Sequence, residues 1–267
     1  MAYLSICAIY RNEGEYLREW IEFHRLVGAE RFYLYDNLST DSHREVLAPY
    51  IEQGVVTVAE WPHTPGQITA YDDCLKLRRD ESRWIAFIDL DEFLFSPTGG
   101  RVSDILVEFE DAPGVVANWA VFGPSGHVAK PDGLVIENYV RRSDDPMFNH
   151  QVKSIVNPRR VANFCGPHFF TYGDGLAVDE NGNPVKPRNV TDSVSFSRLR
   201  VNHYVTRSQE EFEEKLQLRK ADTGMLREGR NLERRYRKLD EVRDEAIHVH
   251  LDDLRRALAT NARKELA

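Results

Sequence analysis

Apolar residues in the first half of the chain form short continuous runs separated by more mixed segments. Four of these runs are typical of buried strands, at residues 4–9, 31–36, 55–61 and 84–89. Helices are predicted between them, at residues 15–28, 42–53 and 64–82. Gly28 and Gly54 stand where the first two helices are expected to end. Strands and helices that alternate at this spacing predict right-handed crossovers and a mostly parallel sheet.

The second half has a different character, with more Gly, Pro and Asn between residues 101 and 207. Irregular strand signals occur at 114–123 and 193–205, whereas loops and hairpins are predicted at 145–160 and 171–189. A capping box at residues 208–211 predicts one more helix, and the chain from residue 231 onward is charged and helical. The pattern therefore predicts an α/β fold, with helices flanking a mostly parallel sheet and an elaborated C-terminal half.

Composition and charge narrow the class of protein. The chain has 267 residues and a net charge of −8, which argues against a nucleic-acid binder with a broad basic surface. Three widely spaced cysteines, Cys7, Cys74 and Cys165, indicate neither a disulfide framework nor a zinc site. The N-terminus lacks the basic region and cleavage site of a signal peptide, and no segment approaches the ~18 apolar residues of a transmembrane helix. We therefore expect a cytoplasmic protein.

Three acids close the fourth apolar run, WIAFIDLDEF, namely Asp89, Asp91 and Glu92. A D-x-D at a strand end places two carboxylates on the same side of an extended chain, where they can share a hard divalent cation. Ligands of open α/β sheets bind outside the carboxyl ends of the strands, and these acids lie at such an end. A manganese or magnesium site that neutralises a diphosphate is predicted here, with an acidic turn as the alternative.

Polar residues also follow the first two strands. Asn12 and Glu13 follow the first, and Asn12 is equally explained as a cap of the next helix. Asp36 and Asn37 end the second strand, where a carboxylate suits the N3–H of a uracil ring. Gln67 is a further candidate, although a capping box of the third helix also explains it.

The second half adds further candidates. His203 alternates with the apolar residues of its strand but lies near the strand end, which favours metal or phosphate ligation over a core histidine. His168 is a second candidate for such ligation. Trp119 is interpreted either as a platform for a sugar ring or as core. Asp145, in the compact acidic loop DDPMFNH, is the candidate for a catalytic base that accepts the proton of an acceptor hydroxyl.

Taken in order, the motifs YRNE, YDNLSTD, WIAFIDLDEF, WAVFG and NHYVTRSQEEFEEK resemble glycosyltransferase family 92, over roughly residues 3–220. The resemblance implies a GT-A fold and an inverting sugar transfer from a nucleotide-sugar, often UDP-activated, with a divalent metal that is commonly manganese. It also implies that Asp89 and Asp91 are the D-x-D, that Asp36 is the acid at the nucleotide end, and that His203 lies near the metal and diphosphate.

Together these observations give one set of expectations. The expected metal ligands are Asp89, Asp91 and His203. The expected nucleotide-binding residues are Ile9, Arg11, Asn12, Glu13, Asp36, Asn37, Gln67, Asp89 and Leu90. A GT-A domain is expected at 1–225 and a helical extension at 226–267. The expected partners are a nucleotide-sugar donor and a saccharide or lipid-linked acceptor, without nucleic acid or a transmembrane segment, and peripheral membrane contact is allowed.

Two alternatives remain open at this point. In a metal-dependent phosphohydrolase, Asp89 would be the nucleophile and Asp91 the acid. That class usually carries its motif on the first strand with Gly and Thr after it, whereas here the motif ends the fourth strand and Phe93 and Leu94 follow. The second alternative is a non-catalytic module that binds a sugar or nucleotide.

Overall fold

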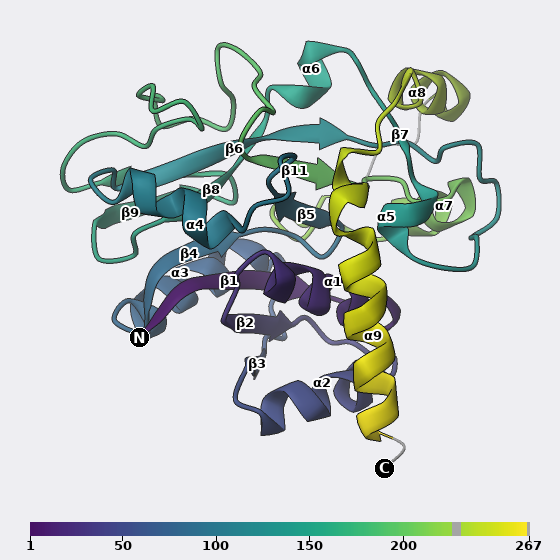
Figure 1. The fold of residues 1–267 in the computed structure, drawn as a ribbon, viewed down its shortest axis with the longest axis horizontal. Coiled ribbons are helices and arrows are strands. Elements are labelled where there is room, and N and C mark those ends of the chain that lie inside the picture. The colour runs from purple at the N-terminus through teal and green to yellow at the C-terminus, as the bar shows by residue number, and fades with distance from the viewer. Residues whose placement is uncertain (226–230, 266–267) are drawn as a thin grey trace.

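The computed structural model describes residues 1–225 and 231–265, with side chains up to residue 260. An eight-stranded sheet lies at the centre of this part of the chain, in the order β3-β2-β1-β4-β8-β6-β11-β5 (Figure 1). The strands from the first half are β1 (Ala2–Tyr10), β2 (Arg31–Asp36), β3 (Val56–Glu60) and β4 (Ser82–Phe87). These four are mutually parallel, which confirms the predicted arrangement of the first half.

The helices of the first half cover both faces of these strands. They are α1 (Gly14–Leu26), α2 (His43–Glu52) and α3 (Gln67–Arg78). The main core cluster contains residues of α1 and α2, whereas α3 packs on a second cluster with Cys7, Ile85 and Phe87. Burial on both faces explains why β1, β2 and β4 have continuous apolar runs, whereas the edge strand β3 is only partly buried. The third helix begins at Gln67, three residues later than predicted from the sequence.

The second half completes the sheet with β5 (Glu92–Phe95), β6 (Gly114–Val121), β8 (Val152–Val156) and β11 (Arg200–His203). The prediction of loops and hairpins across 145–160 is wrong for β8, which lies between β4 and β6 and is fully buried. Lys153 and Ser154 interrupt its apolar pattern, so the short segment carries no clear strand signal.

Smaller elements connect and flank these strands. They are α4 (Val102–Leu106), η1 (Val107–Phe109), α5 (Val135–Asn138), β7 (Arg141–Arg142), α6 (Pro146–Asn149), β9 (Val161–Gly166), β10 (Phe169–Tyr172), α7 (Gln209–Leu216), α8 (Leu232–Leu239), β12 (Val242–Arg243), η2 (Ala246–His250) and α9 (Leu251–Glu265). The predicted capping box at the start of α7 is confirmed, because Ser208 and Glu211 bond each other's backbone amides.

The C-terminal helices pack on the same core as the sheet. Helix α9, yellow in Figure 1, runs alongside α1, and Leu254 is fully buried within the main core cluster. Leu239 of α8 belongs to the same cluster. The predicted division at 225/226 stays a prediction, and residues 226–230 lie outside the described part. Every helix of the described part is too short or too polar to cross a lipid bilayer.

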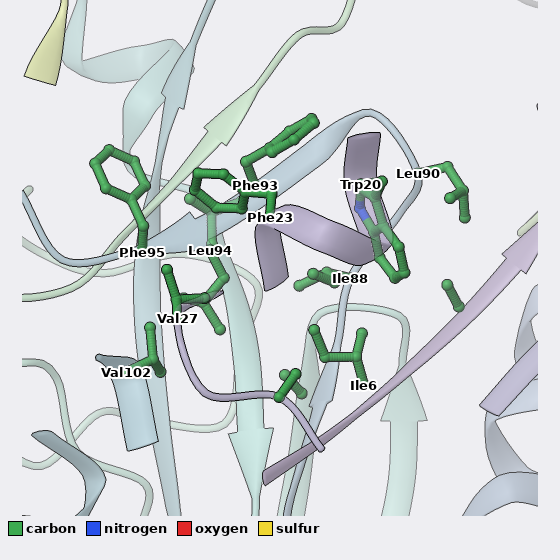
Figure 2. Packing of buried hydrophobic residues seen from close by; sticks show 14 of the residues in the cluster. Ile6, Trp20, Phe23, Val27, Ile88, Leu90, Phe93, Leu94, Phe95 and Val102 are labelled. Carbon is green, nitrogen blue, oxygen red and sulfur yellow. The ribbon is translucent and has the colours of Figure 1, made fainter. Parts of the chain in front are cut away.

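Strand β5 is anchored by aromatic packing on α1. The Phe23 ring lies 5.1 Å from Phe93 and 6.3 Å from Phe95, centroid to centroid, and Figure 2 shows these rings grouped around β5. Trp20 donates its indole N–H to the carbonyl oxygen of Glu92 at 2.8 Å. Since β4 and β5 are both fixed in the core, the short turn between them holds its acidic residues in defined positions.

His24 links α1 to β5 through both ring nitrogens. Its Nδ1 lies 2.8 Å from the carbonyl oxygen of Trp20, and its Nε2 accepts the backbone N–H of Leu94 at 3.1 Å. The ring therefore carries its proton on Nδ1 and is neutral. Complete burial lowers the pKa of His24 to about 3, although the bond to Trp20 opposes the shift.

This histidine predicts acid sensitivity of the fold. Because its folded-state pKa lies below the ordinary value of 6.5, the unfolded chain binds the proton first, and stability falls as the pH drops from 6.5 towards 3. We expect His24 alone to lower the free energy of unfolding by roughly 2 kcal/mol between pH 6.5 and pH 5. Urea unfolding of wild type and His24→Gln at both pH values measures the contribution of His24 to the free energy of unfolding. The variant should lose clearly less stability over the interval, and an equal loss would exclude His24 as the source.

Candidate active site

The turn between β4 and β5 carries the three acids and lies at the carboxyl edge of the parallel strands. Glu92 is fully buried, whereas the side chains of Asp89 and Asp91 are 31% and 13% exposed. Glu92 Oε2 accepts the backbone N–H of Asp89 at 2.8 Å, which closes the turn. The two aspartates thus face the accessible side, and Glu92 supports them from within.

Asp89 is held by three donors. Its Oδ1 accepts from Gln67 Nε2 at 2.7 Å and from Tyr71 Oη at 3.1 Å, and its Oδ2 accepts from Lys153 Nζ at 2.8 Å. Burial alone would raise the pKa of Asp89, but the Lys153 ammonium outweighs it and holds this pKa below its usual range. Gln67 therefore belongs to the site. The alternative that it forms a capping box is wrong, because it is the first residue of α3 and Gly66 is the N-cap.

Lys153 is one residue of this site that sequence reasoning missed. Its side chain is 1% exposed, and its ammonium lies 2.8 Å from Asp89 Oδ2 and 3.2 Å from Glu92 Oε2. Burial alone would lower the pKa of Lys153, but these two carboxylates raise it above its usual range. The pKa of Glu92 is raised as well, to about 7, because its burial outweighs the opposing effect of the lysine. A charged lysine is thus built permanently into the sheet beneath the acids.

Asp91 faces a second set of groups. Its Oδ2 accepts a hydrogen bond from Lys215 Nζ of α7 and lies 3.5 Å from His203 Nε2 at the end of β11. Burial alone would raise the pKa of Asp91, but Lys215 and His203 hold it well below its usual range. The structure thus brings together the predicted metal ligands Asp91 and His203, and adds Lys215, which the sequence did not single out.

Glu13 reaches the same region through Arg207. Its Oε2 accepts from Arg207 Nη2 at 2.8 Å, and the guanidinium carbon lies 3.5 Å from the centroid of the Tyr16 ring. Burial alone would lower the pKa of Arg207, but Glu13 and its neighbours, Asp91 among them, raise it. A second fixed positive charge therefore lies close to Asp91.

The other predicted nucleotide residues line the ends of β1 and β2 and make internal contacts. Asp36 accepts the N–H of Ser39 at 2.8 Å and lies 3.3 Å from His43 Nε2. Asn37 donates to the carbonyl oxygens of Trp61 and His63, which orders the loop after β3.

Asn12 does not cap α1, because the N-cap residue is Glu13 and Asn12 Oδ1 accepts the N–H of Thr40 at 2.8 Å. Ile9 and Leu90 are buried at the edge, and Arg11 is exposed. The nucleotide roles of these residues stay predictions.

Three candidates of the second half have different surroundings. Trp119 is 9% exposed and packs against both His168 and His203, with ring centroids 5.2 Å and 4.3 Å away. Asp145 is the N-cap of α6, accepts the N–H of Met147 at 2.9 Å and lies 3.4 Å from Lys238 Nζ. The bond from Met147 holds the pKa of Asp145 below its usual range. These contacts explain Asp145 as a helix cap, and its role as base stays a prediction.

The donor set at Asp91 suits a divalent ion that a substrate helps to bind. A separation of 3.5 Å between Asp91 Oδ2 and His203 Nε2 suits two ligands of one ion with bonds of about 2.1 Å. His203 Nδ1 and Glu92 Oε1 are 3.9 Å apart, and both are buried without a hydrogen-bond partner in the described part. A carboxylate behind the second ring nitrogen is typical of metal-binding histidines. Within residues 1–225 and 231–260, however, no three His, Cys, Asp or Glu side chains form a metal cluster by themselves.

Comparison with known proteins identifies the family. The chain matches the model of glycosyltransferase family 92 over residues 2–235, and it therefore belongs to that family. The predicted family and mixed α/β GT-A fold are confirmed, and the prediction of a glycosyltransferase is confirmed at the level of the family. This membership gives no support to the phosphohydrolase alternative.

Curated relatives are similar over part of their length. A glycosyltransferase family 92 protein of Ricinus communis is 32% identical over 59% of this chain and 29% of its own length. One from Oryza sativa subsp. japonica is 33% identical over 58% and 27%. The galactan β-1,4-galactosyltransferase GALS2 of Arabidopsis thaliana is 36% identical over 39% and 22%. The matched region thus spans under a third of each of these relatives.

Among solved structures, residues 1–349 of S. aureus TarS match with a TM-score of 0.40 and 12% identity, covering 58% of this chain and 47% of that one. The mannosyltransferase PcManGT of Pyrobaculum calidifontis matches with a TM-score of 0.33 and 14% identity, covering 43% and 35%.

Proposed function

We propose that this chain catalyses an inverting, metal-dependent transfer of a sugar from a UDP-sugar to a hydroxyl of a saccharide or lipid-linked acceptor. The observation that carries the proposal is the group around Asp91, where a carboxylate and His203 Nε2 face each other at 3.5 Å. Asp91 and His203 would hold Mn²⁺ or Mg²⁺, with diphosphate oxygens and water as the remaining ligands. The ion would act as a Lewis acid that stabilises the diphosphate leaving group.

The residues around Asp89 suit the nucleoside part of the donor. A carboxylate accepts up to about four hydrogen bonds, and Asp89 already accepts three from the protein. It retains capacity for one ribose hydroxyl, in an orientation fixed by Gln67 and Lys153. Asp36 and Asn37 lie at the end of β2, where the base would be bound. This division of roles leaves Asp91 as the main carboxylate ligand of the metal.

The acceptor side is defined less closely. The name of the Arabidopsis relative, galactan β-1,4-galactosyltransferase, supports a saccharide acceptor and makes UDP-galactose the first donor to test. Asp145 is the proposed base, and Asp145→Asn tests it, because asparagine caps a helix about as well but accepts no proton. A cytoplasmic location and peripheral membrane contact stay predictions.

The proposed function predicts a preference for uridine nucleotides. Isothermal titration calorimetry with Mn²⁺ should give UDP binding at least tenfold tighter than GDP or ADP, which corresponds to about 1.4 kcal/mol. Incubation with UDP-galactose, UDP-glucose, UDP-GlcNAc and GDP-mannose, with saccharide acceptors, should release UDP and form product with inverted anomeric configuration by NMR. Equal nucleotide affinities would contradict the uridine assignment. Nucleotide binding without any product would instead indicate a binding module.

A further inference from the structure

The two lysines at the acids differ in how firmly they are held. Lys153 extends from a central strand, is 1% exposed and contacts two carboxylates. Lys215 is 26% exposed and contacts Asp91 Oδ2 and, at 3.1 Å, the carbonyl oxygen of Val205. The Lys215 ammonium can therefore leave these partners for others and stay in contact with solvent. The Lys153 ammonium would be left buried without a partner if it left its carboxylates.

The helix that carries Lys215 is fixed at its start. The capping box of Ser208 and Glu211 closes the first turn, Tyr16 donates to Glu211, and Phe212 is buried. Lys215 lies in the last turn of α7. Its ammonium stands on a flexible four-carbon chain, so it can move by several ångströms while the helix stays in place.

The chain beyond α7 crosses the carboxyl edge of the sheet. The carbonyl oxygen of Ala221 accepts the N–H groups of both Gly66 and Gln67 at 3.0 Å, at the start of α3. Gln67 in turn donates to Asp89. Lys215 and the residues up to Ala221 thus extend from one aspartate of the D-x-D to the helix that holds the other.

The position of Lys215 conflicts with a metal on Asp91. An ammonium and a divalent cation cannot both lie within bonding distance of the same carboxylate oxygen without strong repulsion. We propose that Lys215 is an exchangeable cation: it neutralises Asp91 in the enzyme without nucleotide, and it moves to the diphosphate when a metal ion binds Asp91. This inference rests on the proposed function.

The charge of the leaving group gives this movement a role in the reaction. The diphosphate of a UDP-sugar carries two negative charges, which one divalent ion balances. When the glycosidic bond breaks, the β-phosphate gains a further negative charge, and Lys215 supplies the positive charge that balances it. Interactions that strengthen as charge develops accelerate the reaction. Lys215 should therefore favour UDP over the intact UDP-sugar.

Lys215→Met tests the exchange because it removes the ammonium and keeps an unbranched side chain of nearly the same length. Without nucleotide, Mn²⁺ titrated by water proton relaxation should bind the variant about fivefold tighter or more, because its competitor for Asp91 is gone. With saturating Mn²⁺, UDP should bind the variant at least tenfold more weakly, while UDP-galactose loses no more than about threefold. Opposite effects on metal and nucleotide are not expected of a lysine that only stabilises the fold.

Two controls accompany this variant. Lys76→Met removes a lysine of α3 that is 70% exposed and bonded to Asp72. It should change neither the dissociation constant of Mn²⁺ nor that of UDP. Lys215→Arg keeps the charge and should keep the preference for UDP.

The proposal is overturned if Lys215→Met leaves Mn²⁺ affinity unchanged or lower, or if UDP and UDP-galactose weaken equally. Wild type that binds Mn²⁺ but no uridine nucleotide would refute the proposed function instead, while the metal titration still tests the contact with Asp91.

Discussion

Replacement of Asp91 by asparagine is expected to lower the rate of sugar transfer by a factor on the order of 100 or more. Asparagine keeps the size of the side chain but removes its charge, and the metal loses its main protein ligand. The fold should survive, because Lys215 is 26% exposed and can turn its ammonium to water. The melting temperature should therefore change by only a few degrees.

Metal binding provides a readout that is independent of turnover. In wild type, Mn²⁺ should bind weakly alone and more tightly with UDP, because few protein groups bind it and the diphosphate supplies further oxygens. Asp91→Asn should remove most of this tightening. Asp72→Asn is the matched control, since Asp72 also pairs with a lysine but lies on the surface of α3. Full activity of Asp91→Asn after chelation and readdition of metal would show that Asp91 has another role.

The first half of the fold could be predicted because three of its four strands, β1, β2 and β4, are buried on both faces. The run at 31–36 is a strand in the structure with the same bounds, the run at 4–9 lies within β1, and the run at 84–89 overlaps β4 up to Phe87. The strands of a parallel sheet covered by helices can be recognised in the sequence as apolar runs at regular spacing. The strand β8 has no such run, since a lysine and a serine stand among its five residues.

A metal site at the acidic turn stays a prediction, and the structure shows that the protein itself supplies positive charge there, from Lys153 and Lys215. Lys153 is 64 residues from Asp89 along the chain, and Lys215 is 124 residues from Asp91. Pairings over such distances depend on strand order, which no local pattern encodes. One signal was present: a lysine inside the otherwise mostly apolar segment VKSIV is costly to bury and implies a partner of opposite charge.

The caps of α1 and α3 could not be predicted from the local sequence, unlike the capping box of α7. The capping box that was an alternative explanation of Gln67, with Thr64 as its N-cap, is absent: the N-cap is Gly66, and the carbonyl oxygen of Ala221 accepts the amides of Gly66 and Gln67. Asn12 has a φ of 55° and bonds Thr40 rather than its own helix. In α1, Asp41 Oδ2 accepts the N–H of Gly14 at 2.7 Å from another loop. Tertiary contacts thus supply the caps at both helices, and these contacts are also what bring Gln67 into the site.

The largest loss of stability is expected from Lys153→Met. This change leaves Glu92, which is fully buried, and Asp89 without their common cation. Breaking a buried ion pair by removing one partner costs about 3–5 kcal/mol, which corresponds to a fall of about 6–20 °C in melting temperature for a chain of this size. Thermal unfolding measures this loss of stability. Lys76→Met, on the surface of α3, is the matched control and should change the melting temperature little.

A double variant identifies the cause of that loss. Glu92→Gln in the Lys153→Met background removes one of the two uncompensated carboxylates, so it should recover part of the lost stability. If the loss came only from missing packing of the lysine stem, the second change would recover nothing. The remaining unpaired carboxylate, Asp89, would still repel the diphosphate and lose its fixed orientation. UDP affinity of the double variant should therefore stay at least tenfold below that of wild type, even where its stability is recovered. If stability and UDP affinity both recover, Lys153 serves only to stabilise the fold.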